Sequence, residues 1–269
     1  MGRTLLGIAG FPVAHSRSPA MQNAALRELE LDWLYVALPL VPERFAETAS
    51  SLAASGYRGI NVTIPHKAAA HDLADERTAA ATAIGAANTL TYEDGRIEAD
   101  NTDAGGLLDA LGWSGGAPAG VDCLVLGAGG SARAAAWALR EAGAARVSVW
   151  NRTAERAADL AADLGVRHAD RPRSADLIVN CTSVGLGGEP PGQEAALGAV
   201  GLAGIGPPAT FCDLVYGSEP TALARWAERG GSRVVDGLEV LVRQGARSLE
   251  RWTERPAPVD AMRAAARAS

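Results

Sequence analysis

Lysine is almost absent from this chain of 269 residues. Lysine and arginine together number 25, and all but Lys67 are arginine. A lysine ammonium can release its proton in a pocket, whereas the guanidinium of arginine keeps its charge in proteins. Lys67 follows an apolar run and Pro65-His66, at the end of a predicted strand, where α/β proteins place their sites. These features favour proton chemistry at Lys67 over an ordinary surface lysine.

Cysteine is also scarce, with Cys123, Cys181 and Cys212 as its three occurrences. Each lies in an apolar stretch without CxxC spacing or a clustered histidine. We therefore predict buried, reduced thiols in a cytoplasmic protein, and neither a disulfide nor a metal site. The net charge of −6 argues against a nucleic acid-binding surface, which is normally basic.

Long apolar runs are missing as well. No segment is long enough to predict a membrane span, and the N-terminus lacks the apolar region and cleavage site of a signal peptide. No heptad pattern or broad apolar stripe indicates an oligomer, so the sequence leaves a homodimer open. The apolar content of 48% and the charged content of 21% are those of a globular protein.

Strand and helix patterns alternate along the chain, which predicts an α/β fold with mostly parallel sheets. The first part is predicted to contain strands at 5–9, 33–40, 59–64, 89–92 and 96–99, and helices at 19–31, 42–54, 75–84 and about 104–111. After a loop at 115–120, we expect strands at 121–126, 146–150, 177–181, 210–214 and 233–235, and helices at 131–142, 153–164, 238–252 and 259–267. Ser18, Asp103 and Thr153 stand where helix caps are expected.

A glycine-rich turn joins a predicted strand to a predicted helix at Gly127-Ala128-Gly129-Gly130-Ser131-Ala132. This order fits GxGxxA, in which the glycines allow a tight turn and close approach to a pyrophosphate. The amides at the start of the helix would receive the phosphates. The position of the motif between a strand and a helix makes a dinucleotide site more specific than the motif alone.

The next predicted strand ends in Trp150-Asn151-Arg152-Thr153, without the acidic residue that usually holds the ribose of NAD. Arg152 and Arg156 are one helical turn apart and can form charge-assisted hydrogen bonds with a 2′-phosphate. Two arginines in an arginine-rich chain also suit a solvated surface. The missing acid nevertheless favours NADP as the cofactor.

Polar side chains gather at the strand ends of the first hundred residues. They include the hydroxyls of Ser16, Ser18 and Thr63, the amide of Asn88 and the carboxylate of Asp103, together with Lys67. Such donors and acceptors suit a small polyhydroxylated ligand. Individually, Ser18 and Asp103 have an alternative role as helix caps, and Asn88 as a turn residue.

Nine consecutive stretches carry a resemblance to a known family: GFPVAHSRSP, GINVTIPHK, IGAANTL, DNTDAGG, VLGAGGSARA, WNRTAER, NCTSVGL, DLVYGSEPT and DGLEVLVRQGA. They are similar to those of the shikimate dehydrogenase family, in the family's order and over nearly the whole chain. The resemblance implies reversible, NADPH-dependent reduction of 3-dehydroshikimate to shikimate. It also implies a substrate domain at 1–103 plus 240–269 and a Rossmann-like NADP domain at 104–239, with a cleft between them and the C-terminal helices returning to the first domain.

The resemblance also implies residue roles. Lys67 and Asp103 would be catalytic. Substrate would be bound by Ser16, Ser18, Thr63, Lys67, Asn88, Asp103, Tyr216 and Gln244. NADP would be bound by Gly127, Ala128, Gly129, Gly130, Ser131, Asn151, Arg152, Thr153, Arg156, Thr182, Ser183, Leu214 and Gly237. Three positions depart from the family pattern, namely Gln22, Glu239 and Arg243, of which the last two are spaced for a pair on one helical face.

Two alternatives remain at this point. A relative with the same fold could act on quinate or aminoshikimate, although the two serines and the missing ribose-binding acid favour shikimate with NADP. A non-catalytic NADP-binding scaffold is the second alternative. It is disfavoured because such a protein would have no need for Lys67 and Asp103 beside a glycine loop.

Overall fold

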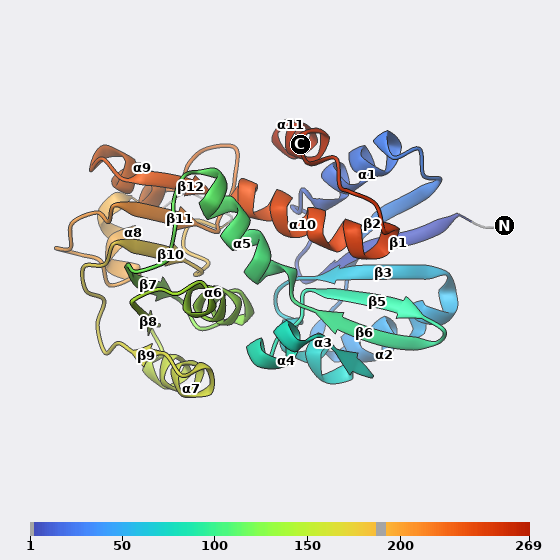
Figure 1. Ribbon diagram of the computed structural model, residues 1–269, viewed down its shortest axis with the longest axis horizontal. Coiled ribbons are helices and arrows are strands. Elements are labelled where there is room, and N and C mark those ends of the chain that lie inside the picture. The colour runs from blue at the N-terminus through green and yellow to red at the C-terminus, as the bar shows by residue number, and fades with distance from the viewer. Residues whose placement is uncertain (1–2, 187–191) are drawn as a thin grey trace. The chain divides into compact units, whose positions relative to one another are not determined.

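The computed structural model describes residues 3–186 and 192–269 of the chain. The chain divides into two compact units, which are Met1–Gly106 with Leu241–Ser269, and Leu107–Val240 (Figure 1). The unit boundaries fall inside helices α5 (Thr102–Trp113) and α10 (Gly237–Thr253). The sequence-based domain limits at 103 and 239 fall inside the same two helices.

The first unit is built on a six-stranded sheet with strand order β2-β1-β3-β5-β6-β4. Its strands are β1 (Thr4–Gly10), β2 (Trp33–Pro39), β3 (Tyr57–Val62), β4 (Glu76–Arg77), β5 (Thr89–Glu93) and β6 (Arg96–Asp100). β1 pairs in parallel with β2 and β3, and β4 with β6, whereas β5 pairs antiparallel with both neighbours. The sheet is therefore mixed, because the β5–β6 hairpin at Asp94-Gly95 reverses the chain.

Both faces of this sheet are covered, as the alternation along β3 shows. Ile60 and Val62 point into an apolar cluster with Phe45 of α2 (Pro42–Leu52). The side chain between them, Asn61, points the other way and donates to Ser248 of α10. The other helical segments of this unit are α1 (Ser18–Glu28), η1 (Ala53–Ser55), α3 (Lys67–Leu73), α4 (Ala79–Ile84) and α11 (Val259–Ala268).

The second unit is built on a parallel sheet with strand order β12-β11-β10-β7-β8-β9. Its strands are β7 (Asp122–Leu126), β8 (Arg146–Trp150), β9 (Arg167–His168), β10 (Leu177–Asn180), β11 (Thr210–Asp213) and β12 (Arg233–Asp236). α6 (Gly130–Glu141) and α7 (Ala154–Leu164) bury one face. α8 (Gln193–Ala199) and α9 (Ala222–Arg229) bury the other, as expected for a doubly wound sheet.

The structure corrects several local predictions. The helix predicted at 75–84 begins only at Ala79, because Glu76 and Arg77 pair with β6 instead. Ser18 is the first residue of α1 and not its cap, and Thr153 precedes α7 without a capping side-chain hydrogen bond. The predictions lacked α3, α8, α9 and β9.

The cap predicted at Asp103 is also wrong, because α5 begins at Thr102 and Asp103 is its second residue. All three cysteines are free, but only Cys123 and Cys212 are buried, whereas Cys181 is partly exposed. In the described part of the chain, no helix has the length and apolar composition to cross a bilayer. Residues 3–186 and 192–269 also contain no group of three His, Cys, Asp or Glu side chains arranged for a metal ion.

Candidate functional site

Lys67 forms an ion pair with Asp103. The Nζ–Oδ2 distance is 2.6 Å, and the two side chains are 12% and 18% exposed. Lys67 is the first residue of α3, and Asp103 lies in the first turn of α5. Both side chains are mostly buried but remain in contact with solvent. The Lys67 ammonium is therefore held in place by Asp103 and is still accessible to a small ligand.

The turn before Lys67 is fixed by His66, which is buried. Its ring stacks on Phe45 at a centroid distance of 4.4 Å, and its Nε2–H donates to the carbonyl oxygen of Leu40 at 2.7 Å. Its backbone N–H donates to Thr63 O at 2.9 Å. These contacts set where α3 begins and therefore where the Lys67 side chain starts.

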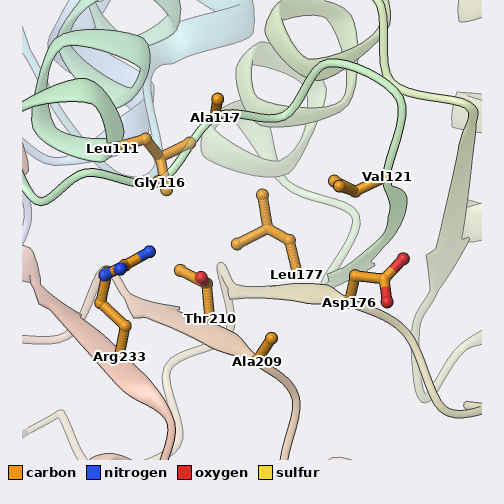
Figure 2. Close-up of a pocket in the computed structure, with 9 residues that line it drawn as sticks. All are labelled: Leu111, Gly116, Ala117, Val121, Asp176, Leu177, Ala209, Thr210 and Arg233. Atoms are coloured by element: carbon orange, nitrogen blue, oxygen red, sulfur yellow. The ribbon is translucent and has the colours of Figure 1, made fainter.

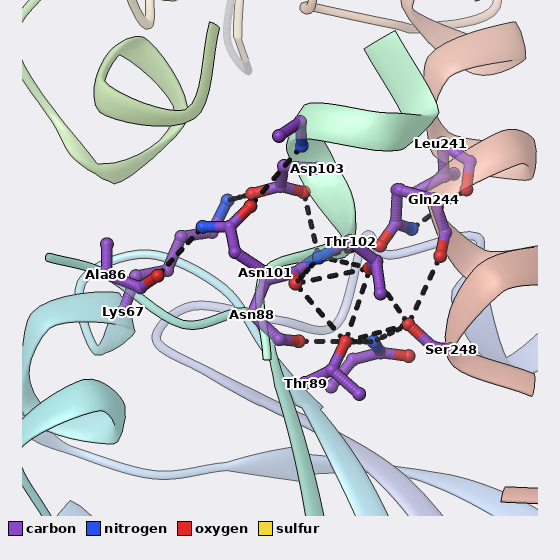
Figure 3. A network of polar contacts seen from close by, with 12 residues as sticks. Lys67, Ala86, Asn88, Thr89, Asn101, Thr102, Asp103, Leu241, Gln244 and Ser248 are labelled. Atoms are coloured by element: carbon purple, nitrogen blue, oxygen red, sulfur yellow. Dashed lines mark hydrogen bonds and ion pairs between the residues drawn. The ribbon is translucent and has the colours of Figure 1, made fainter. Parts of the chain in front are cut away.

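Asn88 holds the second oxygen of Asp103, and its amide orientation is well determined. The backbone N–H of Thr102 donates to Asn88 Oδ1 at 2.7 Å, so the NH₂ group faces the other way. There it donates to Asp103 Oδ1 at 2.9 Å and to Gln244 Oε1 at 3.0 Å. The structure thus brings together Lys67, Asp103, Asn88 and Gln244, four of the predicted substrate residues (Figure 3).

A buried hydroxyl network lies next to Asn88 (Figure 3). Ser248 Oγ is 2.8 Å from Thr89 Oγ1 and 3.0 Å from Thr102 Oγ1, and it accepts from Asn61 Nδ2 at 2.8 Å. No role was predicted from the sequence for Asn61, Thr89 or Thr102. Ser248 was missed, and its one signal is its position a helical turn after Gln244.

Ser16 and Ser18 lie together before and at the start of α1. The backbone N–H of Ser18 donates to Ser16 Oγ at 3.2 Å, and Ser18 is buried while Ser16 is half-buried. Thr63 packs against Gly10, since a Cβ there would lie 2.3 Å from the Thr63 methyl carbon. The two serines and Thr63 follow β1 and β3, at their carboxyl ends.

The glycine turn after β7 is tight at Gly127 and open at Gly129. Gly127 has a φ of +110°, and a Cβ there would lie 3.0 Å from the carbonyl oxygen of Cys181. Apart from its chain neighbours, no atom of the described residues lies within 4 Å of a Cβ built on Gly129, and α6 begins at Gly130 without a capping side chain. Ala132 is fully buried against the sheet. The backbone amides at the start of α6, those of Gly130 and Ser131, therefore suit a pyrophosphate, as the GxGxxA pattern predicts.

The residues predicted to bind the adenosine end of the cofactor lie just after β8. Asn151 Nδ2 donates to the carbonyl oxygen of Thr153 at 2.9 Å, which shapes the turn into α7. Arg152 and Arg156 are both exposed, on the turn and in the first turn of α7. Their guanidinium groups are thus accessible to an anionic ligand, as a 2′-phosphate requires.

The remaining predicted cofactor residues follow β10, β11 and β12. Thr182 donates from its N–H and its hydroxyl to Asn180 Oδ1, at 3.1 and 2.7 Å, whereas Ser183 is exposed. Leu214 N–H donates to the carbonyl oxygen of Asn180 at 3.0 Å. A Cβ on Gly237 would lie 2.5 Å from the carbonyl oxygen of Asp213, so only glycine fits there. Tyr216 lies on the loop after β11, in the second unit.

Among the three departures from the family pattern, Gln22 has a structural explanation. It is fully buried in α1, and its Nε2 donates to the carbonyl oxygen of Gly245 in α10 at 2.9 Å. A Cβ on Gly245 would lie 2.3 Å from the end of Met21, so the two helices approach closely here. Glu239 is buried and Arg243 is partly exposed, and their pairing stays a prediction.

A hollow of about 190 Å³ lies elsewhere in the second unit (Figure 2). Leu177, Thr210 and Arg233, which are the first residues of β10, β11 and β12, line it. It therefore opens at the amino ends of the strands, whereas the glycine turn lies at their carboxyl ends. Ligands of open parallel sheets bind outside the carboxyl ends, so this hollow is separate from the candidate site.

Models of one protein family match more than half of the chain. The shikimate dehydrogenase substrate binding domain matches residues 8–90. Shikimate / quinate 5-dehydrogenase matches residues 116–183, and the shikimate 5′-dehydrogenase C-terminal domain matches residues 237–267.

Individual proteins are similar over nearly the full length. The NADP-dependent shikimate dehydrogenase of Anaeromyxobacter sp. (strain K) is 45% identical over 280 residues, covering 96% of this chain and 94% of that protein. The enzyme of the same name from Methanothermobacter thermautotrophicus is 39% identical over 274 residues, covering 97% and 95%. The solved structure of shikimate 5-dehydrogenase from Thermus thermophilus, in complex with NADP(H) and shikimate, has a TM-score of 0.85 at 39% identity and covers 98% of this chain and 99% of its own.

Proposed function

The chain belongs to the shikimate dehydrogenase family, and on this premise we propose which of its residues carry the reaction. The protein is an NADP-dependent oxidoreductase that interconverts 3-dehydroshikimate and shikimate, a step of chorismate and aromatic amino acid biosynthesis. The observation that carries the proposal is the ion pair of 2.6 Å between the only lysine, Lys67, and Asp103.

Lys67 is the proposed proton donor and acceptor. NADPH, when bound, supplies a hydride to the carbonyl carbon of the substrate. The carbonyl oxygen then gains negative charge, and the Lys67 ammonium stabilises this charge and donates its proton. In the reverse direction the neutral amine takes the proton of the hydroxyl. Asp103 holds Nζ in place and binds an adjacent substrate hydroxyl.

Hydroxyls and amides are proposed to hold the substrate. Asn88 and Gln244 are hydrogen-bonded to each other, so substrate hydroxyls would exchange with this contact on binding. Ser16 and Ser18 would bind the carboxylate through hydroxyl donors. The ring hydroxyls and the rest of the ligand would contact Thr63, Lys67, Asn88, Asp103, Gln244 and Tyr216.

The glycine turn and the tip of β8 are proposed to hold NADP. The open space at Gly129 and the uncapped start of α6 support pyrophosphate binding by the backbone. The exposed guanidinium groups of Arg152 and Arg156 support binding of the 2′-phosphate. The residues assigned to NADP are Gly127, Ala128, Gly129, Gly130, Ser131, Asn151, Arg152, Thr153, Arg156, Thr182, Ser183, Leu214 and Gly237.

The substrate domain is proposed to comprise residues 1–103 and 240–269, and the NADP domain residues 104–239. Three free thiols support a cytoplasmic location for the enzyme. Light scattering during size-exclusion chromatography distinguishes a monomer from a homodimer, which the sequence left open.

The substrate preference is tested by steady-state kinetics, with nicotinamide reduction followed by absorbance. Shikimate, quinate and aminoshikimate are each offered with NADP⁺ and with NAD⁺, and kcat/KM is expected to be highest for shikimate with NADP⁺. A higher value for quinate or aminoshikimate would favour a relative with another substrate. Cofactor binding without turnover of any of these compounds would favour the scaffold.

A further inference from the structure

Asp213, the last residue of β11, is a buried acid that the proposed reaction does not use. It is 2% exposed, and its carboxylate accepts three hydrogen bonds. Oδ1 accepts from Asn180 Nδ2 at 2.8 Å and from the backbone N–H of Val215 at 3.1 Å, and Oδ2 accepts from Thr221 Oγ1 at 2.5 Å. These three donors satisfy the hydrogen-bonding needs of a carboxylate that is closed off from water.

One side of this contact set leads to the loop after β10. The amide of Asn180 is oriented by Thr182, whose backbone N–H donates to Asn180 Oδ1. Since Nδ2 must then face the other way, it reaches Asp213. The hydroxyl of Thr182 in turn accepts from the backbone N–H of Val184 at 3.2 Å. Asp213 is therefore connected through one side chain to the turn that carries Thr182 and Ser183.

The other side leads to the loop after β11. Val215 N–H ties the beginning of this loop to Asp213, and Thr221 ties its end, where it also caps α9 by accepting from Ala224 N–H at 3.0 Å. The two loops also touch, because a Cβ on Gly185 would lie 3.2 Å from the Thr221 side chain. One carboxylate thus ties down the loop at 181–186 and both ends of the loop at 214–221.

We infer that Asp213 is a positioning residue that sets the relative geometry of these two loops, and thereby the seat of the nicotinamide half of NADP(H). This inference rests on the proposed function, which assigns Thr182, Ser183 and Leu214 to the cofactor. The adenosine half is assigned to the tip of β8 and α7, which Asp213 does not contact in the described hydrogen bonds. Loss of Asp213 therefore acts on one end of the cofactor and spares the other.

Two ligands separate these ends in a calorimetric titration. NADP⁺ reports on the whole site, whereas adenosine 2′,5′-bisphosphate reports on the adenosine end alone. For Asp213→Ala we expect about 10-fold weaker NADP⁺ binding and a kcat about 10- to 100-fold lower, because small displacements at the reacting centre are costly. The affinity of Asp213→Ala for adenosine 2′,5′-bisphosphate should stay within about twofold of wild type. Asp170→Ala is the control, because Asp170 is an exposed acid of the same unit. Its affinity for both ligands should also stay within about twofold of wild type.

Asp213→Asn distinguishes positioning from charge. Its Oδ1 can still accept from Asn180 and Val215, so we expect NADP⁺ affinity and kcat to recover most of the loss. Equal weakening of both ligands in Asp213→Ala, no weakening of either, or no recovery in Asp213→Asn would overturn the inference.

A second pair of variants covers the case in which Asp213→Ala does not fold. Thr221→Val removes the donor to Oδ2 and should weaken NADP⁺ selectively, whereas Thr221→Ser should restore it. Equal NADP⁺ affinity in Thr221→Val and Thr221→Ser would overturn the inference as well. Wild-type protein that binds NADP⁺ but does not oxidise shikimate would instead contradict the proposed function, so the two failures are distinguishable.

Discussion

Removing the hydroxyl of Ser248 tests whether the buried network beside Asn88 stabilises the first unit. Ser248 is fully buried, and its Oγ lies within 3.0 Å of donors or acceptors on Asn61, Thr89 and Thr102. It also donates to the carbonyl oxygen of Gln244 at 3.1 Å. Ser248→Ala removes all four contacts and leaves their partners in a site closed to solvent.

The expected cost is about 1–3 kcal/mol, the penalty for leaving a buried polar group without its partner. The cost should stay within this range although several partners are affected, because some of them keep other hydrogen bonds. Asn61 Nδ2 can still donate to the carbonyl oxygen of Asn88 at 3.1 Å, and Thr102 Oγ1 can still bond to Asn88. Because about 1.36 kcal/mol corresponds to a factor of ten, local opening should become about 5- to 150-fold more frequent.

Amide hydrogen exchange measures this opening locally, without assuming that two units unfold as one. Peptides from β3, β5 and α10 should exchange faster in Ser248→Ala, while those from β7 and β10 should not change. Ser51→Ala is a matched control, because Ser51 makes the same helical back-bond, to Glu47 O at 2.9 Å, but is exposed. Equal exchange rates in the two variants would refute the network's contribution.

Two further predictions concern the second unit. Arg156→Ala should raise the KM for NADP⁺ about 10-fold with little change in the KM for NAD⁺, since only NADP⁺ has the 2′-phosphate. The control Arg44→Ala changes an exposed arginine of the first unit and should leave both KM values unchanged. Equal effects of Arg156→Ala on both cofactors would contradict 2′-phosphate binding by Arg156. Burial, aided by Asp122 and Asp176, raises the pKa of Cys123 to about 12. At about pH 9 only about one thousandth of this thiol would be thiolate. A disulfide reagent should therefore label the partly exposed Cys181 before Cys123. Rapid labelling of Cys123 in the native protein would contradict its burial.

The sheet strands were largely predictable because buried strands form continuous apolar runs. The strand at 122–126 and the glycine turn after it were expected within a residue or two of where they lie. The helix expected at 75–84 was wrong because Glu76 and Arg77 gain backbone pairing with β6, a contact between distant residues that local helix propensity does not contain.

The candidate site was predictable to the extent that its residues follow strands. Lys67 and Asp103 were expected near each other and form an ion pair. The place of Ser248 in the network was not expected. A single serine on an amphipathic helix is normally predicted to be exposed, and its burial is seen only once the helix is packed on the sheet. Ser18 was expected as a cap, but Ser16 supplies the acceptor, since α1 begins one residue earlier than predicted.

The measurement that tests the role of Lys67 most directly is kcat for shikimate oxidation by Lys67→Arg. Arginine keeps a cation within reach of Asp103 but does not exchange its proton, so binding should be affected less than proton transfer. We predict that kcat falls at least about 100-fold while the KM for shikimate changes by less than about fivefold. A kcat near that of the wild type would contradict proton transfer by Lys67.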